Sequence, residues 1–250
     1  MKLITYFRSV LFYVGQITAL VFFVTTSQVL WLASAKARYG YIHLWARWNI
    51  RWLKWTCGVR YEVHGAENVD KSQAGLILAR HESAWETFAF QEFFPRQTFV
   101  LKQELLKVPF FGWGLKMMGP IAINRNAGRR AMKQVIDLGM DKLAKGIWVV
   151  IFPEGTRMKA GKKGKINAGG ALLAQKSQAL TYLVAHNAGH CWPSGSFLVY
   201  PGKIDVYISP PFKAGEMTVE EINTKLEDWL NRHLELDSKH KSKGGVDNRS

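Results

Sequence analysis

From Gly58 onward, short apolar runs alternate with longer segments in which apolar residues recur at helical spacing. The short runs predict strands at residues 59–63, 75–79, 98–101, 121–123, 147–152, 181–185 and 203–208. The longer segments predict helices near residues 84–93, 104–117, 127–145, 168–178 and 219–234. Because strands and helices alternate along the chain, we expect an α/β fold in which helices layer a mixed sheet.

These elements lie within residues 58–236, where the sequence has neither an internal repeat nor a linker. We therefore expect a single α/β domain over 58–236. Residues 237–250 are polar and charged without apolar periodicity, which predicts a disordered tail.

The first 57 residues follow a different pattern, with no charged residue from Ser9 to Ala35. As a helix this run would be roughly 40 Å long, enough for a hydrocarbon core of about 30 Å. The polar residues TTSQ at 25–28 interrupt it, so both a tilted span and a helix dipping into one leaflet remain open. A cleaved signal peptide is a third alternative, suggested by ASA at 33–35, although such peptides have apolar regions of only ~7–15 residues.

The segment that follows, residues 41–55, is rich in tryptophan and cations. At about 100° per residue one face collects Tyr41, Leu44, Trp45, Trp48, Trp52 and Trp55. Its flank carries Arg47, Arg51 and Lys54. An aromatic face edged with cations is typical of a helix in the membrane interface, and packing of the same tryptophans on the domain core is the alternative. The two can coexist, and we expect residues 1–57 to anchor the protein to a membrane.

Composition agrees with a membrane partner. The chain has 34 Lys and Arg against 19 Asp and Glu, a net charge of +15, which points to an anionic partner. Its ten tryptophans favour a membrane surface over nucleic acid. The excess of cations after the apolar run places the remaining chain in the cytoplasm, at the inner face of the cell membrane. Two cysteines far apart in sequence fit a reducing compartment.

Several familiar site motifs fail on inspection. HESAWE begins like a zinc-protease helix but has Trp85 where the second histidine is needed, and His186 with His190 has no evident third ligand. The loop GTRMKAGKKG has the wrong glycine spacing for a phosphate loop and carries Lys163 in place of Ser or Thr. No G-x-S-x-G elbow occurs. We therefore expect no metal, nucleotide or covalent nucleophile.

Cations follow three of the predicted strands. The run 147–152 leads into PEGTR at 153–157, where a glutamate and an arginine follow a strand end, the place where α/β sheets bind ligands. The planar guanidinium of Arg157 suits a phosphate, while an ion pair is the alternative role for the glutamate. Lys102 and Asn124-Arg125 occupy equivalent positions after two other strands.

The stretch ARHESAWETF at 79–88 has two interpretations. His81 and Glu86 could form a catalytic pair, or Ser83 and Glu86 could form a capping box that starts a helix. On a continuous helix, residues five apart lie about 140° from each other. A helix that begins at Ser83 would leave His81 outside it, free to fold back toward Glu86.

Four segments together resemble the 1-acylglycerol-3-phosphate acyltransferase family in order and spacing. They are H-x-x-x-x-E at 81–86, KQELLKVPFFGW at 102–113, GPIAINR at 119–125 and FPEGTR at 152–157. The resemblance runs from about residue 75 to about residue 195 and implies a glycerolipid acyltransferase-like fold. The family's fourth motif is only loosely matched by residues 180–193.

The resemblance implies that His81 is the catalytic base and Glu86 its partner acid. It implies that the acceptor's phosphate is bound by the other motifs, which here contribute Lys102, Asn124, Arg125, Glu154, Gly155, Thr156 and Arg157. The commoner acid in this family is Asp. Glutamate forms occur in related acyltransferases, including those that acylate the lipid A precursor.

The implied reaction moves an acyl group from an acyl-CoA or acyl carrier protein thioester to the free hydroxyl of lysophosphatidate, giving phosphatidate in phospholipid biosynthesis. No cofactor is implied, and the partners would be membrane lipid, the lysophospholipid and the thioester donor. Acylation of glycerol 3-phosphate, another lysophospholipid or a lipid A precursor is an alternative. A basic membrane-binding module without catalysis is a second alternative.

Overall fold

Seven strands form one mixed sheet in the computed structural model, which describes residues 2–243 and the side chains of 2–234. The strands are β1 (Val59–His64), β2 (Gly75–Ala79), β3 (Gln97–Lys102), β4 (Ile121–Ile123), β5 (Trp148–Ile151), β6 (Leu180–His186) and β7 (Gly202–Ile208). Their order is β1-β7-β6-β2-β5-β3-β4, and only the β6–β7 pair is antiparallel among them. The expected mixed sheet and all the expected strands are confirmed.

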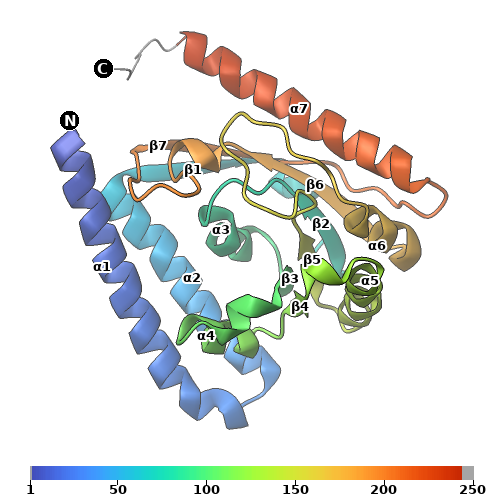
Figure 1. Cartoon of the computed structure of the whole chain (residues 1–250), viewed down its shortest axis with the longest axis horizontal. Coiled ribbons are helices and arrows are strands. Elements are labelled where there is room, and N and C mark those ends of the chain that lie inside the picture. Colours follow the sequence, from blue (N-terminus) through green and yellow to red (C-terminus); the bar gives the residue numbers. More distant parts are fainter. Residues whose placement is uncertain (1, 244–250) are drawn as a thin grey trace.

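Helices cover both faces of this sheet, which explains why its central strands are apolar throughout. Every residue of β2 and β5 is buried. One core joins the sheet to α2 (Ala35–Cys57) and α3 (Trp85–Phe93), and the other joins it to α5 (Arg129–Ala144), α6 (Gly169–Ser177) and α7 (Val219–Lys243). Figure 1 shows these two layers, with α1 and α2 at one end of the sheet and α5 and α6 at the other.

The helix expected at 104–117 is broken into two pieces. A 3-10 turn, η3 (Gln103–Lys107), is followed by the short helix α4 (Phe111–Met117). Between them Val108 is extended, with φ −69° and ψ 122°. The cause is Pro109, because a proline lacks the N–H that a helix needs and disfavours helical geometry in the residue before it.

The N-terminal segment forms a helical hairpin (Figure 1). The helix α1 (Lys2–Ser27) ends inside the polar TTSQ run, a 3-10 turn η1 (Gln28–Leu32) follows, and α2 returns along α1. Ser34 caps the start of α2 by accepting a hydrogen bond from the Ala37 N–H at 3.2 Å. Gly58 ends α2 in the left-handed conformation, at the boundary expected between the anchor and the domain.

Side chains fix the register of the hairpin. Pairs in contact are Arg8 with the Thr56 carbonyl, Trp52 with the Phe12 carbonyl, and Thr26 with Tyr41. Gly15 allows the closest approach, because a Cβ there would lie 2.2 Å from Trp52 Nε1. The helices are therefore antiparallel and packed together through most of their length.

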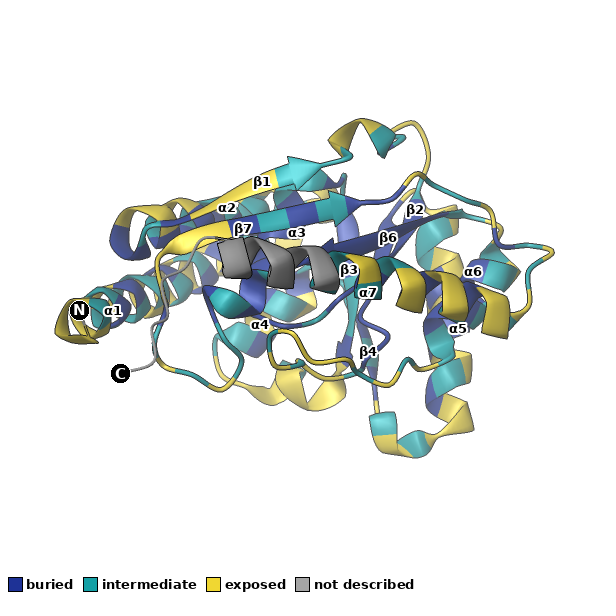
Figure 2. Cartoon of the chain, turned by 90° about the horizontal axis from the view of Figure 1, so that it is seen from above, coloured by how far each residue is buried: buried dark blue, intermediate teal, exposed yellow. Residues whose placement is uncertain are grey.

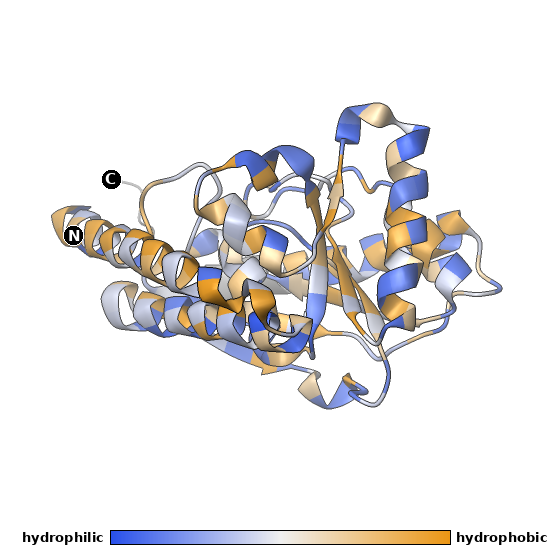
Figure 3. Cartoon of the chain, turned by 90° about the horizontal axis from the view of Figure 1, so that it is seen from below, coloured by the Kyte–Doolittle hydropathy of each residue, from blue (hydrophilic) through white to orange (hydrophobic). Residues whose placement is uncertain are grey.

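One face of α1 remains exposed and apolar. It carries Leu3, Ile4, Phe7, Leu11, Val14, Ile17, Val21 and Phe22, and Figure 3 shows its hydrophobic colouring along the helix. The opposite face, including Ser9 and Phe12, is buried. The segment Lys2–Leu32 is long and apolar enough to cross a membrane, and among the described residues it alone meets that test.

The aromatic face expected on α2 is divided between two environments. Trp45 is buried against Phe88, with ring centroids 5.2 Å apart, whereas Leu44 and Trp55 are 51% and 72% exposed. Trp48 and Trp52 stack on each other and pack against the core. Core packing therefore applies to Trp45, Trp48 and Trp52, and the membrane-interface interpretation stays a prediction for the exposed Leu44 and Trp55.

The last helix is longer than expected. The sequence predicts a disordered tail over 237–250, but α7 continues to Lys243, and residues 244–250 lie outside the described residues. The strand β1 forms one edge of the sheet, next to β7, and Figure 2 shows exposed residues along it.

Candidate active site

The predicted site residues follow parallel strands that end at the same edge of the sheet. His81 comes after β2, Arg157 after β5, Lys102 ends β3 and Arg125 follows β4. The strands β2, β5, β3 and β4 are parallel neighbours. Their carboxyl ends therefore converge, as expected for a ligand site in an α/β sheet.

His81 and Glu86 are in direct contact. The imidazole Nδ1 lies 2.7 Å from Glu86 Oε1. This contact is possible because α3 begins at Trp85, which leaves His81 in the preceding loop while Glu86 occupies the first turn. The helix begins two residues later than the expected start at Ser83, whose hydroxyl accepts a hydrogen bond from the Trp85 N–H at 3.1 Å.

The same glutamate oxygen also caps the loop. Glu86 Oε1 accepts hydrogen bonds from the Ser83 N–H at 2.9 Å and the Glu82 N–H at 3.0 Å. One atom therefore makes both the contacts of a cap and the contact with His81, while the catalytic role of the pair stays a prediction.

Glu86 is fully buried, yet it is held ionised. Burial raises its pKa, but the hydrogen bond from His81, the electrostatic effect of the His186 and His81 side chains, and the Ser83 N–H together bring the pKa below its ordinary value. A carboxylate at this position can accept the Nδ1–H of His81, and an imidazole in that tautomer has its Nε2 lone pair available to take up a proton.

Contacts with the segment after β5 fix His81 in place. Its ring stacks on Phe152, with centroids 4.1 Å apart and planes 14° apart. The His81 N–H donates to Glu154 Oε2 at 2.7 Å, and the His81 carbonyl accepts from the Met158 N–H at 2.7 Å. The imidazole is therefore oriented by both its ring and its backbone.

Glu154 does not face the site cavity. It is buried beneath the His81 loop, and its Oε1 lies 3.6 Å from Arg80 Nη1, so the ion-pair alternative applies. In the structure its Oε2 contacts the backbone of His81, and its predicted contact with substrate stays a prediction. Burial raises the pKa of Glu154 to about 7, despite the His81 N–H and the Arg80 charge that lower it.

Arg80 is a buried cation that contacts both Glu82 and Glu154 beneath the His81 loop. It was not predicted from the sequence. It is 2% exposed, pairs with Glu82, and donates through Nη2 to the Lys162 carbonyl at 2.5 Å. The only sequence signal was its position next to His81. Phe152 was also missed, although it lies inside the FPEGTR motif.

A cavity of about 380 Å³ opens in front of His81. Three cations line it: Lys102, Arg125 and Arg157. Most of its wall is apolar and is formed by Trp45, Phe88, Phe99, Val100, Leu101, Leu105, Phe111, Leu115, Met118 and Phe152. The cavity can therefore accept a molecule that is anionic at one point and apolar elsewhere.

The remaining predicted residues separate into two groups. Gly155 and Thr156 line the cavity, and the Gly155 carbonyl accepts a hydrogen bond from Arg125 Nη1, which joins the two motifs. Gly155 has φ +71°, a conformation that favours glycine. Asn124 is not among the residues that line the cavity, and its side chain accepts the Asn126 N–H at 3.0 Å, so its role in substrate binding stays a prediction.

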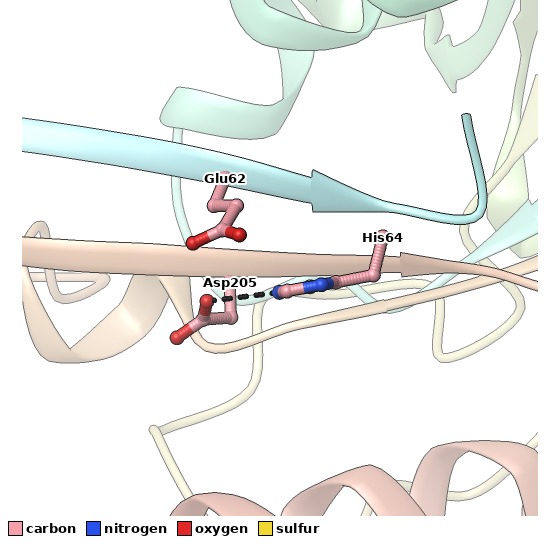
Figure 4. A group of neighbouring side chains, drawn as sticks. All are labelled: Glu62, His64 and Asp205. Atoms are coloured by element: carbon pink, nitrogen blue, oxygen red, sulfur yellow. Dashed lines mark hydrogen bonds and ion pairs between the residues drawn. The ribbon is translucent and has the colours of Figure 1, made fainter.

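In the described part of the chain, one group of side chains has the ligand types of a metal site. Glu62, His64 and Asp205 project together from β1 and β7 (Figure 4). Lys203 already forms ion pairs with Glu62 and, at 3.0 Å, with Asp205. This ammonium offsets one of the two carboxylate charges, and none of the three residues lines the cavity at His81.

Known proteins share this sequence and this fold. The family model described as Acyltransferase matches residues 60–189. The 1-acyl-sn-glycerol-3-phosphate acyltransferase of Pseudomonas aeruginosa is 42% identical over 203 residues, which cover 80% of this chain and 79% of that relative. The Borreliella burgdorferi protein of the same name is 26% identical over 188 residues, 72% of this chain and 74% of that relative.

The fold has a counterpart among solved structures. The crystal structure of the 1-acyl-sn-glycerophosphate acyltransferase of Thermotoga maritima matches 95% of this chain and 97% of that chain, with a TM-score of 0.78 at 24% identity. The family match spans the histidine–glutamate pair and every cation of the cavity. The chain therefore belongs to the acyltransferase family, and the protein is an O-acyltransferase.

Proposed function

We propose that the protein acylates lysophosphatidate at its free hydroxyl, using an acyl thioester, and releases phosphatidate for phospholipid biosynthesis. The observation that carries the proposal is the cavity, in which the His81 base lies beside three cations and an apolar wall. Lysophosphatidate has the matching parts: a hydroxyl, a phosphate and one acyl chain. The name of the Pseudomonas aeruginosa relative supports the same acceptor.

In the proposed reaction His81 acts as a general base. Its Nε2 removes the hydroxyl proton as the substrate oxygen attacks the thioester carbonyl, and a tetrahedral oxyanion forms. When this intermediate collapses, the C–S bond breaks and the imidazolium returns the proton to the leaving thiolate. Glu86 stabilises the imidazolium between these steps. A base of this kind contributes about 10²–10⁴-fold, and the substrate hydroxyl takes the place of an enzyme nucleophile.

Phosphate binding is assigned to Arg157 and Lys102. Both line the cavity and neither forms an ion pair with the described residues. Arg125 has a mixed role, because it lines the cavity but also holds the Gly155 carbonyl. The cations would fix the phosphate and so place the hydroxyl near His81.

The proposed donor is a thioester of coenzyme A or of acyl carrier protein. No cofactor takes part in this scheme, because the proton transfers and the charge stabilisation come from side chains and the substrates. The apolar wall contributed by α2, η3 and α4 would receive the acyl chains.

We also propose that α1 lies in the membrane interface instead of crossing the bilayer, at the cytoplasmic face of the inner membrane. Its exposed face is apolar, but its other face is buried against α2 and the catalytic domain. A spanning α1 would carry these polar neighbours into the hydrocarbon core, at a high cost. Interfacial binding leaves every one of these contacts intact.

The test is an acyl-transfer assay on purified protein with several acceptors and both donors. Lysophosphatidate should be used far better than glycerol 3-phosphate, lysophosphatidylcholine or a lipid A precursor. The variant Arg157→Ala should lose activity on lysophosphatidate much more than on monoacylglycerol, which has no phosphate. Equal losses on both acceptors would mean that Arg157 is structural, and a stronger use of another acceptor would replace the proposed substrate.

A further inference from the structure

A second cavity lies outside the catalytic site, between α2, the edge strand β1 and α3. Its volume is about 750 Å³, and it shares no lining residue with the cavity at His81. Four cations line it: Arg47, Arg51, Lys54 and Arg60. We name it the α2–β1 cleft.

The charge of the α2–β1 cleft is not balanced from within. Glu92 is the single acid of its lining, and this carboxylate is already engaged by Tyr61 at 2.5 Å and by Arg47 at 3.8 Å. Arg51, Lys54 and Arg60 are exposed and form no ion pair among the described residues. A cleft with this excess of cations attracts an anion.

The surface beside the cleft identifies the source of the anion. On α2 the exposed Leu44 and Trp55 lie between the line of cations and the side that packs on α1, given about 100° per residue. The surface of the hairpin therefore changes in a fixed order: it begins with the apolar face of α1, continues with Leu44 and Trp55, and ends with the cations of α2. Apolar, aromatic and cationic side chains in this order match the layers of a bilayer surface, where lipid phosphates lie above the acyl chains.

We propose that the α2–β1 cleft binds the phosphate headgroup of an anionic phospholipid, as a binding site separate from the catalytic cavity. The Arg51 and Arg60 guanidinium groups contact the headgroup from α2 and from β1, while the hairpin rests on the acyl chains. The inference does not depend on the acyl-transfer chemistry.

The test compares binding to vesicles of phosphatidylcholine with binding to vesicles that also contain phosphatidylglycerol. The variant R51Q/R60Q removes two cations of the cleft, and the control K133Q/K176Q removes two exposed cations from α5 and α6. The wild type should prefer the anionic vesicles. In R51Q/R60Q this preference should fall roughly fivefold or more, given the usual contribution of each cation near an anionic surface. The control should keep the wild-type preference.

Two further measurements make the result decisive. Binding of R51Q/R60Q to phosphatidylcholine vesicles and its acyl transfer to detergent-solubilised lysophosphatidate should equal those of the wild type, which shows an intact fold. An unchanged preference in R51Q/R60Q, or equal losses in both variants, overturns the proposal. The proposal is also overturned if R51Q/R60Q loses activity with acyl carrier protein thioesters but not with acyl-CoA. The cleft would then receive an acidic protein.

Discussion

At the scale of single residues, Glu86 links local folding to catalysis. Its Oε1 accepts one hydrogen bond from the imidazole and two from the backbone that starts α3. A shorter acid at this position would have to reach the same three donors. The carboxylate therefore holds the loop in the shape that presents His81, and in the proposed reaction it would also stabilise the charge that His81 acquires.

Replacing Glu86 with Gln separates these two roles. The amide oxygen can still cap α3, but it has no negative charge with which to stabilise the imidazolium. We expect kcat to fall by roughly 10²-fold or more with little change in KM. Steady-state kinetics on lysophosphatidate would measure this, with circular dichroism as the check on folding. Glu86→Asp keeps the charge and should retain more activity than the Gln variant; the reverse order would contradict the charge argument.

The pKa of Glu154 is raised, whereas that of Glu86 is lowered, and this predicts a dependence of stability on pH. The pKa of Glu154 is raised to about 7, so the folded protein binds a proton that the unfolded chain releases near its ordinary value of 4.5. Protonated Glu154 therefore stabilises the folded state fully below pH 4.5. This contribution to the free energy of unfolding is lost as the pH rises toward 7, by up to about 3 kcal/mol. Glu154→Gln keeps an acceptor for the His81 N–H and should remove this pH dependence.

The measurement is the free energy of unfolding in detergent between pH 5 and pH 8, for the wild type and for Glu154→Gln. The wild type should lose stability across that range, and the variant should show a flatter profile. Its KM for lysophosphatidate should stay near the wild-type value because Glu154 does not line the cavity. A large rise in KM would instead indicate that Glu154 contacts the substrate.

At this scale the sequence predicted the residues of the site better than their contacts. His81, Glu86 and the cavity cations follow from motif spacing. His81, Lys102 and Arg125 lie at or within two residues of a strand end, Arg157 lies in the loop after β5, and Glu86 lies in the first turn of α3. The burial of Glu154 under His81 depends on the pairing of β2 with β5, which a single sequence does not specify. The turn made by the Asn124 side chain was not predicted either, because a motif position does not specify the direction of a side chain.

At the scale of elements, the hairpin of α1 and α2 depends on a close helix–helix contact at Gly15. Gly15→Ala would place a methyl group 2.2 Å from Trp52 Nε1. We expect a loss of roughly 1–3 kcal/mol of stability, because side chains must shift to relieve the overlap. Thermal unfolding in detergent would show the lower Tm.

Gly40 provides the matched control in α2. A Cβ at Gly40 meets no atom within 4 Å, so Gly40→Ala should be neutral or stabilising by about 0.5–1 kcal/mol through helix propensity. Similar losses in both variants would mean that helix packing at Gly15 does not hold the hairpin together.

The expected strands were found because the runs are short, apolar and fully buried, as in β2 and β5. The break in the helix expected at 104–117 follows from Pro109. The prediction gave more weight to the apolar periodicity of this segment than to its proline. The strand order was out of reach, because parallel neighbours such as β2 and β5 are distant in sequence and join through contacts that periodicity does not encode.

At the scale of the whole molecule, the apolar face of α1 should govern membrane binding. Phe7 and Phe22 are 66% and 60% exposed, so changing both to Ser removes apolar surface without opening the core. We expect at least a tenfold weaker partition into phosphatidylcholine vesicles. Leu138→Ser with Met140→Ser, on the exposed side of α5, is the control and should bind as the wild type does. Vesicle flotation measures both, and unchanged binding of the Phe variant would contradict the interfacial proposal.

The contact of α1 with the far end of the chain also affects how the protein is made. Ser9 bonds to the Val199 N–H and Tyr13 to Trp192, across 190 and 179 residues of sequence. At the usual rate of synthesis the ribosome needs roughly 10–40 s to produce the later partner after α1 has emerged. During that interval the part of α1 that packs on the catalytic domain lacks its partners, although α2 has already emerged beside it. Under the interfacial binding proposed for α1, the nascent hairpin would meet the bilayer before the catalytic domain is complete, and the domain would assemble on a helix that has already bound there.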